Sequence, residues 1–283
     1  MISIEQWKQD GQYFNYQGHQ IFFRDEGHGD TLVCIHGFPV SSWDWRFLLP
    51  ELTKRYRVIA IDMLGFGFSD KPKKHTYSVI EQADIHVALL NHLNIHQYQL
   101  IAHDFGTLIA QELLSRTKAF DQPLPTSLFA MSGSIFPELS KPRFIQKLLI
   151  SKAGPLISNL FNEKKFVNSF QQVFAESNRP DDQTTKDYWQ LLCEKEGNRI
   201  LHHLNFFITD RKNHGHRWAE AWQTANVSIR YLAGQSDPMY GGDTIQTLKN
   251  LSQKKDIQSI SDTGHFPHIE APNKVLESLN SFL

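Results

Sequence analysis

Three side chains have the types and the order needed for covalent catalysis: Asp104, Asp237 and His265. An aspartate is ionised at neutral pH, so its carboxylate can attack a saturated carbon without a base to activate it. A histidine that a second carboxylate orients can then deprotonate a water molecule. Each of the three follows an apolar segment within a few residues, which predicts that they meet at one end of a sheet. We therefore predict Asp104 as the nucleophile, His265 as the general base and Asp237 as the acid that orients the histidine.

The segment around Asp104 has the form of a nucleophile elbow. A strand is expected over residues 98–102, and a helical pattern begins at Thr107. A tight strand-to-helix turn needs small residues on both sides of the nucleophile, and Ala102 and Gly106 meet this need. Taken alone, an aspartate after a strand is more often a helix N-cap. The elbow assignment therefore depends on finding Asp237 and His265 further along the chain, in the order nucleophile, acid, histidine.

A His-Gly-Phe-Pro motif at residues 36–39 supports the same site. It follows a continuous apolar strand over residues 31–35. In an elbow-type site, a backbone N–H of this loop and the N–H after the nucleophile form an oxyanion hole. The sequence therefore predicts the amides of Phe38 and Phe105 as its two donors.

The order of strands and helices predicts an α/β fold with a mostly parallel, eight-stranded sheet flanked by helices. A hairpin at the N-terminal end adds the antiparallel edge. Strand patterns disappear between residues 136 and 216, where only helical patterns remain. We therefore predict a core domain formed by residues 1–135 and 217–283, with an inserted helical cap (lid) domain at 136–216. The expected strands are 13–16, 20–24, 32–36, 57–62, 98–102, 128–132, 227–233 and 257–261, and the expected core helices are 42–52, 79–93 and 107–115.

Composition is that of a globular enzyme of 283 residues with 40% apolar side chains. The formal net charge of −1 gives no electrostatic reason to expect a nucleic-acid or membrane partner. The two cysteines, Cys34 and Cys193, indicate no disulfide framework. The chain has no signal-peptide pattern and no apolar run long enough to cross a bilayer. We expect a cytoplasmic monomer or homodimer.

A metal centre is not expected. Four histidines gather near the end of the predicted cap, but their spacing has no consistent ligand geometry and the proposed chemistry needs no metal. We therefore predict no cofactor, and the expected partners are a small apolar substrate and water. The four are His202, His203, His214 and His216.

Five motifs together resemble the α/β-hydrolase superfamily, in its branch of epoxide hydrolases and haloalkane dehalogenases. They lie at residues 36–39, 62–69, 102–106, 235–238 and 264–266. Within that branch the sequence is most similar to the mesoderm-specific transcript group of animal proteins, through residues 103–114, 134–138 and 145–149. The resemblance extends over nearly the whole chain. It implies an α/β-hydrolase fold with a cap, and a hydrolase that forms an alkyl-enzyme ester on Asp104.

The resemblance also bears on the leaving group. In this branch, halide release relies on a Trp directly after the nucleophile and on a second donor from an Asn or Trp. Here Phe105 and Phe38 occupy these places, and neither ring has an N–H. The interpretation as a haloalkane dehalogenase is therefore weakened. The fluoroacetate type is also disfavoured, since it would have an Arg after the nucleophile.

Epoxide opening in this branch uses two cap tyrosines to protonate the alkoxide. Tyr188, with Trp189 beside it, is the only tyrosine in the predicted cap, and it is as well explained by packing. Tyr240 lies outside the cap. The leading interpretation is an epoxide hydrolase-like enzyme, with Tyr188 and Trp189 as candidates for contact with the substrate or leaving group. A haloalkane dehalogenase-like enzyme, another ester hydrolase and a non-catalytic protein of the same fold remain as alternatives.

Overall fold

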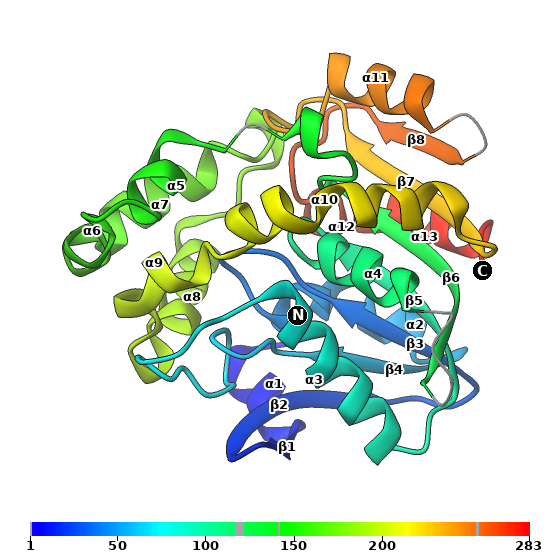
Figure 1. Ribbon diagram of the computed structural model, residues 1–283, viewed down its shortest axis with the longest axis horizontal. Helices are drawn as coiled ribbons and strands as arrows, with labels where there is room; N and C mark the ends of the chain where they lie inside the picture. Colours follow the sequence, from blue (N-terminus) through cyan, green and yellow to red (C-terminus); the bar gives the residue numbers. More distant parts are fainter. Residues whose placement is uncertain (1, 117–121, 141, 253–254) are drawn as a thin grey trace.

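The computed structural model describes residues 2–116, 122–140, 142–252 and 255–283. In these ranges eight strands form one sheet in the order β1-β2-β4-β3-β5-β6-β7-β8 (Figure 1). The pairs β1–β2 and β2–β4 are antiparallel, and the other pairs are parallel. This topology confirms the predicted α/β-hydrolase fold. The strands are β1 (Gln12–Tyr16), β2 (His19–Glu26), β3 (Asp30–Ile35), β4 (Tyr56–Ile61), β5 (Gln97–His103), β6 (Leu124–Met131), β7 (Ser228–Gly234) and β8 (Asp256–Ile260).

Helices cover both faces of the sheet because the buried strands are apolar on both faces. In β3, Val33 and Ile35 join one hydrophobic cluster, whereas Leu32 and Cys34 join the other. This alternation follows from the two-residue period of a strand. The first cluster includes residues of α3 (Val79–His92), α4 (Gly106–Ser115) and α10 (Phe207–Thr224), and Figure 1 shows these helices in front of the sheet. The second lies under α1 (Ile4–Gln9), α2 (Leu49–Leu52) and α13 (Pro272–Asn280).

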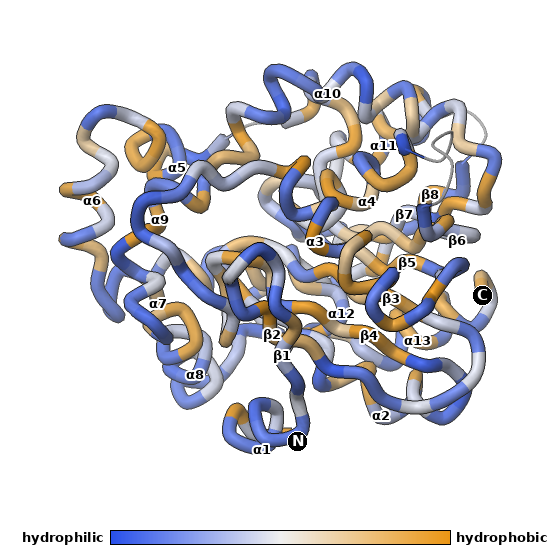
Figure 2. Tube along the Cα trace, turned by 60° about the horizontal axis from the view of Figure 1, so that its bottom comes forward, coloured by the Kyte–Doolittle hydropathy of each residue, from blue (hydrophilic) through white to orange (hydrophobic). Residues whose placement is uncertain are grey.

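The predicted helix over residues 42–52 is divided in two. A 3₁₀ helix runs over Ser42–Phe47, and α2 then begins at Leu49. Pro50 lies in the first turn of α2, where its missing N–H costs nothing, and it could not continue a helix that began earlier. The hydropathy trace in Figure 2 shows the apolar segments along the central strands, with polar residues on the outer loops.

A group of short helices follows β6 and lies at the left of Figure 1. Residues 136–216, apart from the undescribed 141, contain no strand, as predicted. However, α10 continues through residue 216, and Trp218 in its second half is buried in the core cluster that includes α4. The limits of the cap domain, residues 136 and 216, therefore remain a prediction. The helices before α10 are α5 (Phe144–Leu149), α6 (Gly154–Leu160), α7 (Glu163–Gln171), α8 (Asp182–Cys193) and α9 (Leu201–Leu204), with 3₁₀ turns at Pro137–Leu139, Glu176–Asn178 and Glu194–Ile200.

Two further helices complete the C-terminal part, α11 (Asp243–Leu251) and α12 (Pro267–Glu270). None of the helices in the described ranges combines the length and apolarity required to cross a lipid bilayer.

Candidate active site

Asp104 lies at a sharp turn between β5 and α4, with a φ of +49°. This left-handed conformation is strained for a residue other than glycine, and it is typical of functional turns. Glycines allow the surrounding chain to come close. A Cβ at Gly106 would lie 2.6 Å from the carbonyl oxygens of Ile35 and His36, and one at Gly37 would lie 2.8 Å from Cβ of Asp104. The geometry is that of the predicted elbow.

The three predicted catalytic side chains meet at the carboxyl ends of their strands. Nδ1 of His265 lies 2.9 Å from Oδ2 of Asp237, and Nε2 lies 3.6 Å from Oδ1 of Asp104. Asp237 is held in turn by the N–H of Met239, which donates to Oδ1 at 2.8 Å. His265 and Asp237 are buried, whereas 15% of the Asp104 side chain is exposed. A polar line therefore runs from Asp237 through the imidazole to the exposed carboxylate of Asp104.

Charge within this line shifts the pKa of both partners of the Asp104–His265 pair. Burial alone would raise the pKa of Asp104, but the positive charge of His265 lowers it to about 2. Burial alone would lower the pKa of His265, but the charges of Asp237 and Asp104 and the hydrogen bond with Asp237 raise it to about 10. At neutral pH the site therefore holds an ionised Asp104 next to an imidazolium.

The predicted oxyanion-hole donors lie on either side of Asp104. The N–H of Phe38 donates to Oδ2 of Asp104 at 3.0 Å. The N–H of Phe105 lies at the N-terminal end of α4, and within the described part of the chain it has no hydrogen-bond acceptor. Hence one carboxylate oxygen of Asp104 already has a backbone donor, while the N–H of Phe105, the second predicted donor, is unused.

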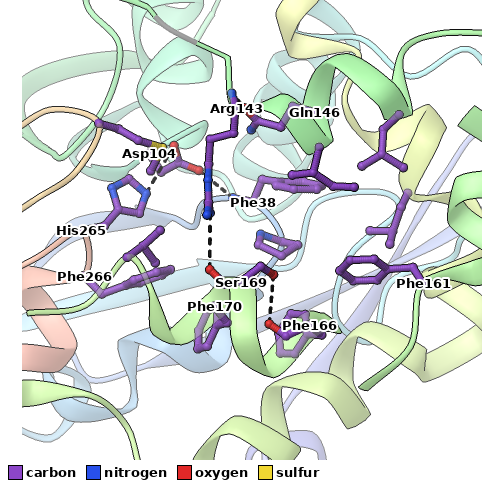
Figure 3. Close-up of a pocket in the computed structure, with 16 residues that line it drawn as sticks. Phe38, Asp104, Arg143, Gln146, Phe161, Phe166, Ser169, Phe170, His265 and Phe266 are labelled. Atoms are coloured by element: carbon purple, nitrogen blue, oxygen red, sulfur yellow. Dashed lines mark hydrogen bonds and ion pairs between the residues drawn. The ribbon is translucent and has the colours of Figure 1, made fainter. Parts of the chain in front are cut away.

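A cavity of about 730 Å³, including its opening to solvent, lies between the elbow and the helices that follow β6 (Figure 3). Asp104 and His265 form part of its wall. Most of the other lining side chains are apolar, and the polar exceptions are Arg143, Gln146 and Ser169. The apolar ones are Phe38, Pro39, Ile145, Leu149, Phe161, Phe166, Phe170, Val173, Leu201, Met239 and Phe266.

Tyr188 and Trp189, the predicted cap candidates, do not line this cavity. Tyr188 is buried behind it, where Nη1 of Arg46 donates to its hydroxyl at 3.0 Å. The Trp189 ring packs against the rings of Phe161 and Phe166, on which the cavity wall is built. The reason is helical geometry: α8 packs on α7, and it is α7 that presents Phe166 and Ser169 to the cavity. The side chains of Tyr188 and Trp189 thus lie behind the residues that line the cavity, and the prediction that they contact the substrate is not supported.

Tyr240 is also outside the lining, although it is close to His265. Its ring stacks on the imidazole of His265, with ring centroids 5.9 Å apart. Burial raises the pKa of its hydroxyl. Tyr240 therefore packs against the His265 ring.

Two residues that sequence reasoning missed hold His265 in place. Glu270 accepts hydrogen bonds from the N–H groups of Gly264 at 2.7 Å and Phe266 at 3.1 Å, one on each side of the histidine. It also accepts from the N–H of Ala175, which ties this loop to the segment after α7. Nε2 of His103 lies 2.8 Å from the carbonyl oxygen of His265. No sequence pattern distinguishes these side chains from ordinary buried polar groups.

One buried group has the residue types of a metal site: Asp44, His103 and His268, whose candidate ligand atoms lie within 4.8 Å of one another. Burial lowers the pKa of His268, and the neighbouring Arg46 lowers it further. The same guanidinium charge opposes a metal cation at this position. We assign no metal to this group.

Comparison with known proteins agrees with this architecture. The family model described as alpha/beta hydrolase fold matches residues 30–272. The human mesoderm-specific transcript homolog protein is 36% identical, with 99% of this chain and 88% of that protein aligned. The putative hydrolase LipZ of Mycobacterium tuberculosis is 33% identical, over 99% of this chain and 98% of that protein. The solved structure of the epoxide hydrolase CorEH has a TM-score of 0.79 at 18% identity, covering 96% of this chain and 97% of that one.

Proposed function

The chain belongs to the alpha/beta hydrolase fold family, and from this premise we propose that it hydrolyses a small electrophile through an alkyl-enzyme ester on Asp104. The observation that carries the proposal is the unequal environment of the two carboxylate oxygens. Oδ2 accepts from the N–H of Phe38, while Oδ1 has no hydrogen-bond donor among the described residues and lies 3.6 Å from Nε2 of His265. A carboxylate in this setting has one oxygen free to attack and one already held.

In the first step, Oδ1 of Asp104 bonds to an electrophilic carbon of the substrate, and the bond from that carbon to the leaving group breaks. The carboxylate is ionised, so no base is required. Displacement at a saturated carbon sends the leaving group to the side opposite Oδ1, away from His265. Oδ2 becomes the carbonyl oxygen of the ester and keeps its hydrogen bond to Phe38.

Formation of the ester then changes the charge of His265. The ester has no negative charge, so the imidazolium loses one of the two carboxylates that raise its pKa. Its pKa falls, and the proton is released to water. The histidine thus becomes a neutral base only after the first step is complete, with Asp237 still bound to Nδ1.

In the second step, a water molecule between Nε2 of His265 and the ester gives its proton to Nε2, and its oxygen bonds to Cγ of Asp104. Negative charge develops on Oδ2, where the N–H groups of Phe38 and Phe105 stabilise it. The intermediate collapses when the Cγ–Oδ1 bond breaks. Oδ1 leaves with the product and takes the proton from His265. The new carboxylic acid of Asp104 then gives its remaining proton to Nε2 of His265, which restores the ionised Asp104 and the imidazolium.

Epoxides are the substrate class that we place first. None of the lining side chains in the described ranges is a tryptophan, so no indole N–H faces the cavity to stabilise a departing halide. No tyrosine lines it either, and we therefore do not propose Tyr188 as the proton donor. The alkoxide from an opened epoxide can take its proton from water at the mouth of the cavity. Haloalkane hydrolysis is the second candidate.

The decisive experiment uses H265Q, in which the first step remains possible and the second is blocked. Incubation with a panel of terminal epoxides and haloalkanes, followed by peptide mass spectrometry, should show a substrate-sized mass increment on the Asp104 peptide. D104N is the control and should show none. Product assays on the wild type for diol and for halide separate the two substrate classes. Wild-type turnover without any adduct in H265Q would contradict the covalent scheme.

A further inference from the structure

Arg143 places a positive charge in a cavity whose lining is mostly apolar. It is the single Lys or Arg among the lining residues that the structure describes. In Figure 3 its side chain extends from the start of α5 across the cavity toward Ser169. Its guanidinium donates two long hydrogen bonds, from Nη1 to the carbonyl oxygen of Ser169 at 3.4 Å and from Nη2 to Oε1 of Gln172 at 3.3 Å. No carboxylate of the described residues lies within ion-pair distance of it.

A partly buried cation without a counter-ion is costly, because it loses hydration and gains no opposite charge. Burial accordingly lowers the pKa of Arg143. The backbone at this residue is nevertheless fixed: its N–H donates to Oε1 of Gln146 at 2.8 Å, which caps the start of α5. The guanidinium is thus held at a position where its N–H groups form only two long hydrogen bonds and no ion pair with a described residue.

The charge of the nucleophile indicates what the cation could do. The charges of the ionised Asp104 and the imidazolium of His265 offset one another in the resting site, so a further cation is needed to attract a substrate with a negative charge into the cavity. Arg143 supplies that cation in the same cavity. Residues 143–171 contain five Lys and Arg side chains and one Glu in a chain of net charge −1, and of the five only Arg143 lines the cavity.

We propose that the substrate of this site carries a carboxylate, which Arg143 binds while the electrophilic carbon faces Asp104. Guanidinium and carboxylate match in shape and form paired hydrogen bonds. The apolar wall formed by Ile145, Leu149 and Phe166 suits the hydrocarbon part of the molecule between the two ends. The substrate class is then an apolar acid with an epoxide or another electrophilic carbon. The role of Asp104 in this inference rests on the proposed function.

Binding of an unreactive acid tests the inference without turnover. In the D104N background, calorimetry measures the dissociation constants of 3-phenylpropanoate and of its neutral amide. We expect R143Q to weaken binding of the acid by roughly tenfold or more and to leave binding of the amide unchanged. R143K should retain part of the affinity for the acid. K147Q is the matched control: it removes an exposed positive charge from α5 outside the cavity lining, and should change both constants less than about twofold.

Equal affinity for the acid in R143Q and its parent would overturn the inference, as would equal losses for acid and amide. A fall in kcat with a neutral epoxide in R143Q, without any change in acid binding, would instead assign Arg143 to the leaving group and also overturn it. The proposed function is judged separately by the adduct in H265Q. If the adduct forms but acid binding does not depend on Arg143, only the proposal that the substrate carries a carboxylate is rejected. Dependence on Arg143 without any adduct would reject only the covalent chemistry.

Discussion

Nε2 of His265 lies 3.6 Å from Oδ1 of Asp104, while Nδ1 of the same ring lies 2.9 Å from Oδ2 of Asp237. The imidazole is therefore placed between two carboxylates. In the proposed mechanism only Asp104 loses its charge during the reaction. The protonation of His265 should thus report on the state of the nucleophile.

We expect D104N to lower the pKa of His265, because an amide keeps the shape of the carboxylate but not its charge. NMR titration of the His265 ring nitrogens in the wild type and in D104N measures the change directly. His75 is a control in the same spectra, because it pairs with Glu81 and is distant in sequence from the elbow. Identical titration of His265 in the two proteins would contradict the proposed step in which His265 loses its proton after Asp104 has become an ester.

The same shift predicts a pH dependence of stability. The folded-state pKa of His265 is raised to about 10, above the value of about 6.5 for an unfolded chain. Protonation of His265 therefore stabilises the fold fully below about pH 6.5, and this contribution is lost as the pH rises toward 10. Urea unfolding should show that the stability advantage of the wild type over D104N shrinks between pH 6.5 and 10. A constant or growing advantage would contradict the prediction.

D237N should slow the second step more than the first. The asparagine can still accept the N–H of Met239, but it no longer provides the charge that orients and supports the imidazolium. We expect kcat to fall by roughly 10²- to 10⁴-fold, with the ester on Asp104 accumulating during turnover. Rapid quench and peptide mass spectrometry measure both quantities. A lower kcat without accumulated ester would place the defect before ester formation.

A single turnover in ¹⁸O-labelled water should transfer an unlabelled oxygen from Asp104 to the product. The reason is that water attacks Cγ, whereas Oδ1 leaves with the substrate carbon. The label should then appear in the Asp104 peptide, as mass spectrometry after proteolysis would detect. Label found only in the first product molecule would indicate direct attack of water on the substrate.

Y188F should reduce stability without reducing catalysis. The Tyr188 hydroxyl accepts a hydrogen bond from Nη1 of the buried Arg46 guanidinium, and its loss leaves Nη1 with only the carbonyl oxygen of Trp43 as a partner. We expect the free energy of unfolding to fall by about 1–3 kcal/mol and kcat to stay within about twofold. Y13F, at an exposed position, is the control for stability. A large loss of kcat in the folded Y188F variant would restore Tyr188 as a candidate proton donor.

Much of this protein could be predicted from its sequence. Apolar strands that alternate with amphipathic helices can bury both faces only as a parallel sheet, and such a sheet gathers the loops after its strands at one edge. Asp104, Asp237 and His265 each follow one of these strands. Their meeting was therefore predictable, although they are far apart along the chain. Ala102 and Gly106 likewise indicated the elbow, because only small residues permit the turn.

Only the tertiary structure decided which side chains of the helical insertion reach the cavity. The helical period is the same for a side chain that faces substrate and for one that faces a neighbouring helix. The sequence around Tyr188 therefore does not indicate that α7 separates its side chain from the cavity. Nor does the sequence around Arg143 indicate that its side chain extends into the cavity. Packing between helices distant in sequence fixes these positions. The sequence by itself determined the fold and the three candidate catalytic positions, and the arrangement of the helices after β6 decided what surrounds them.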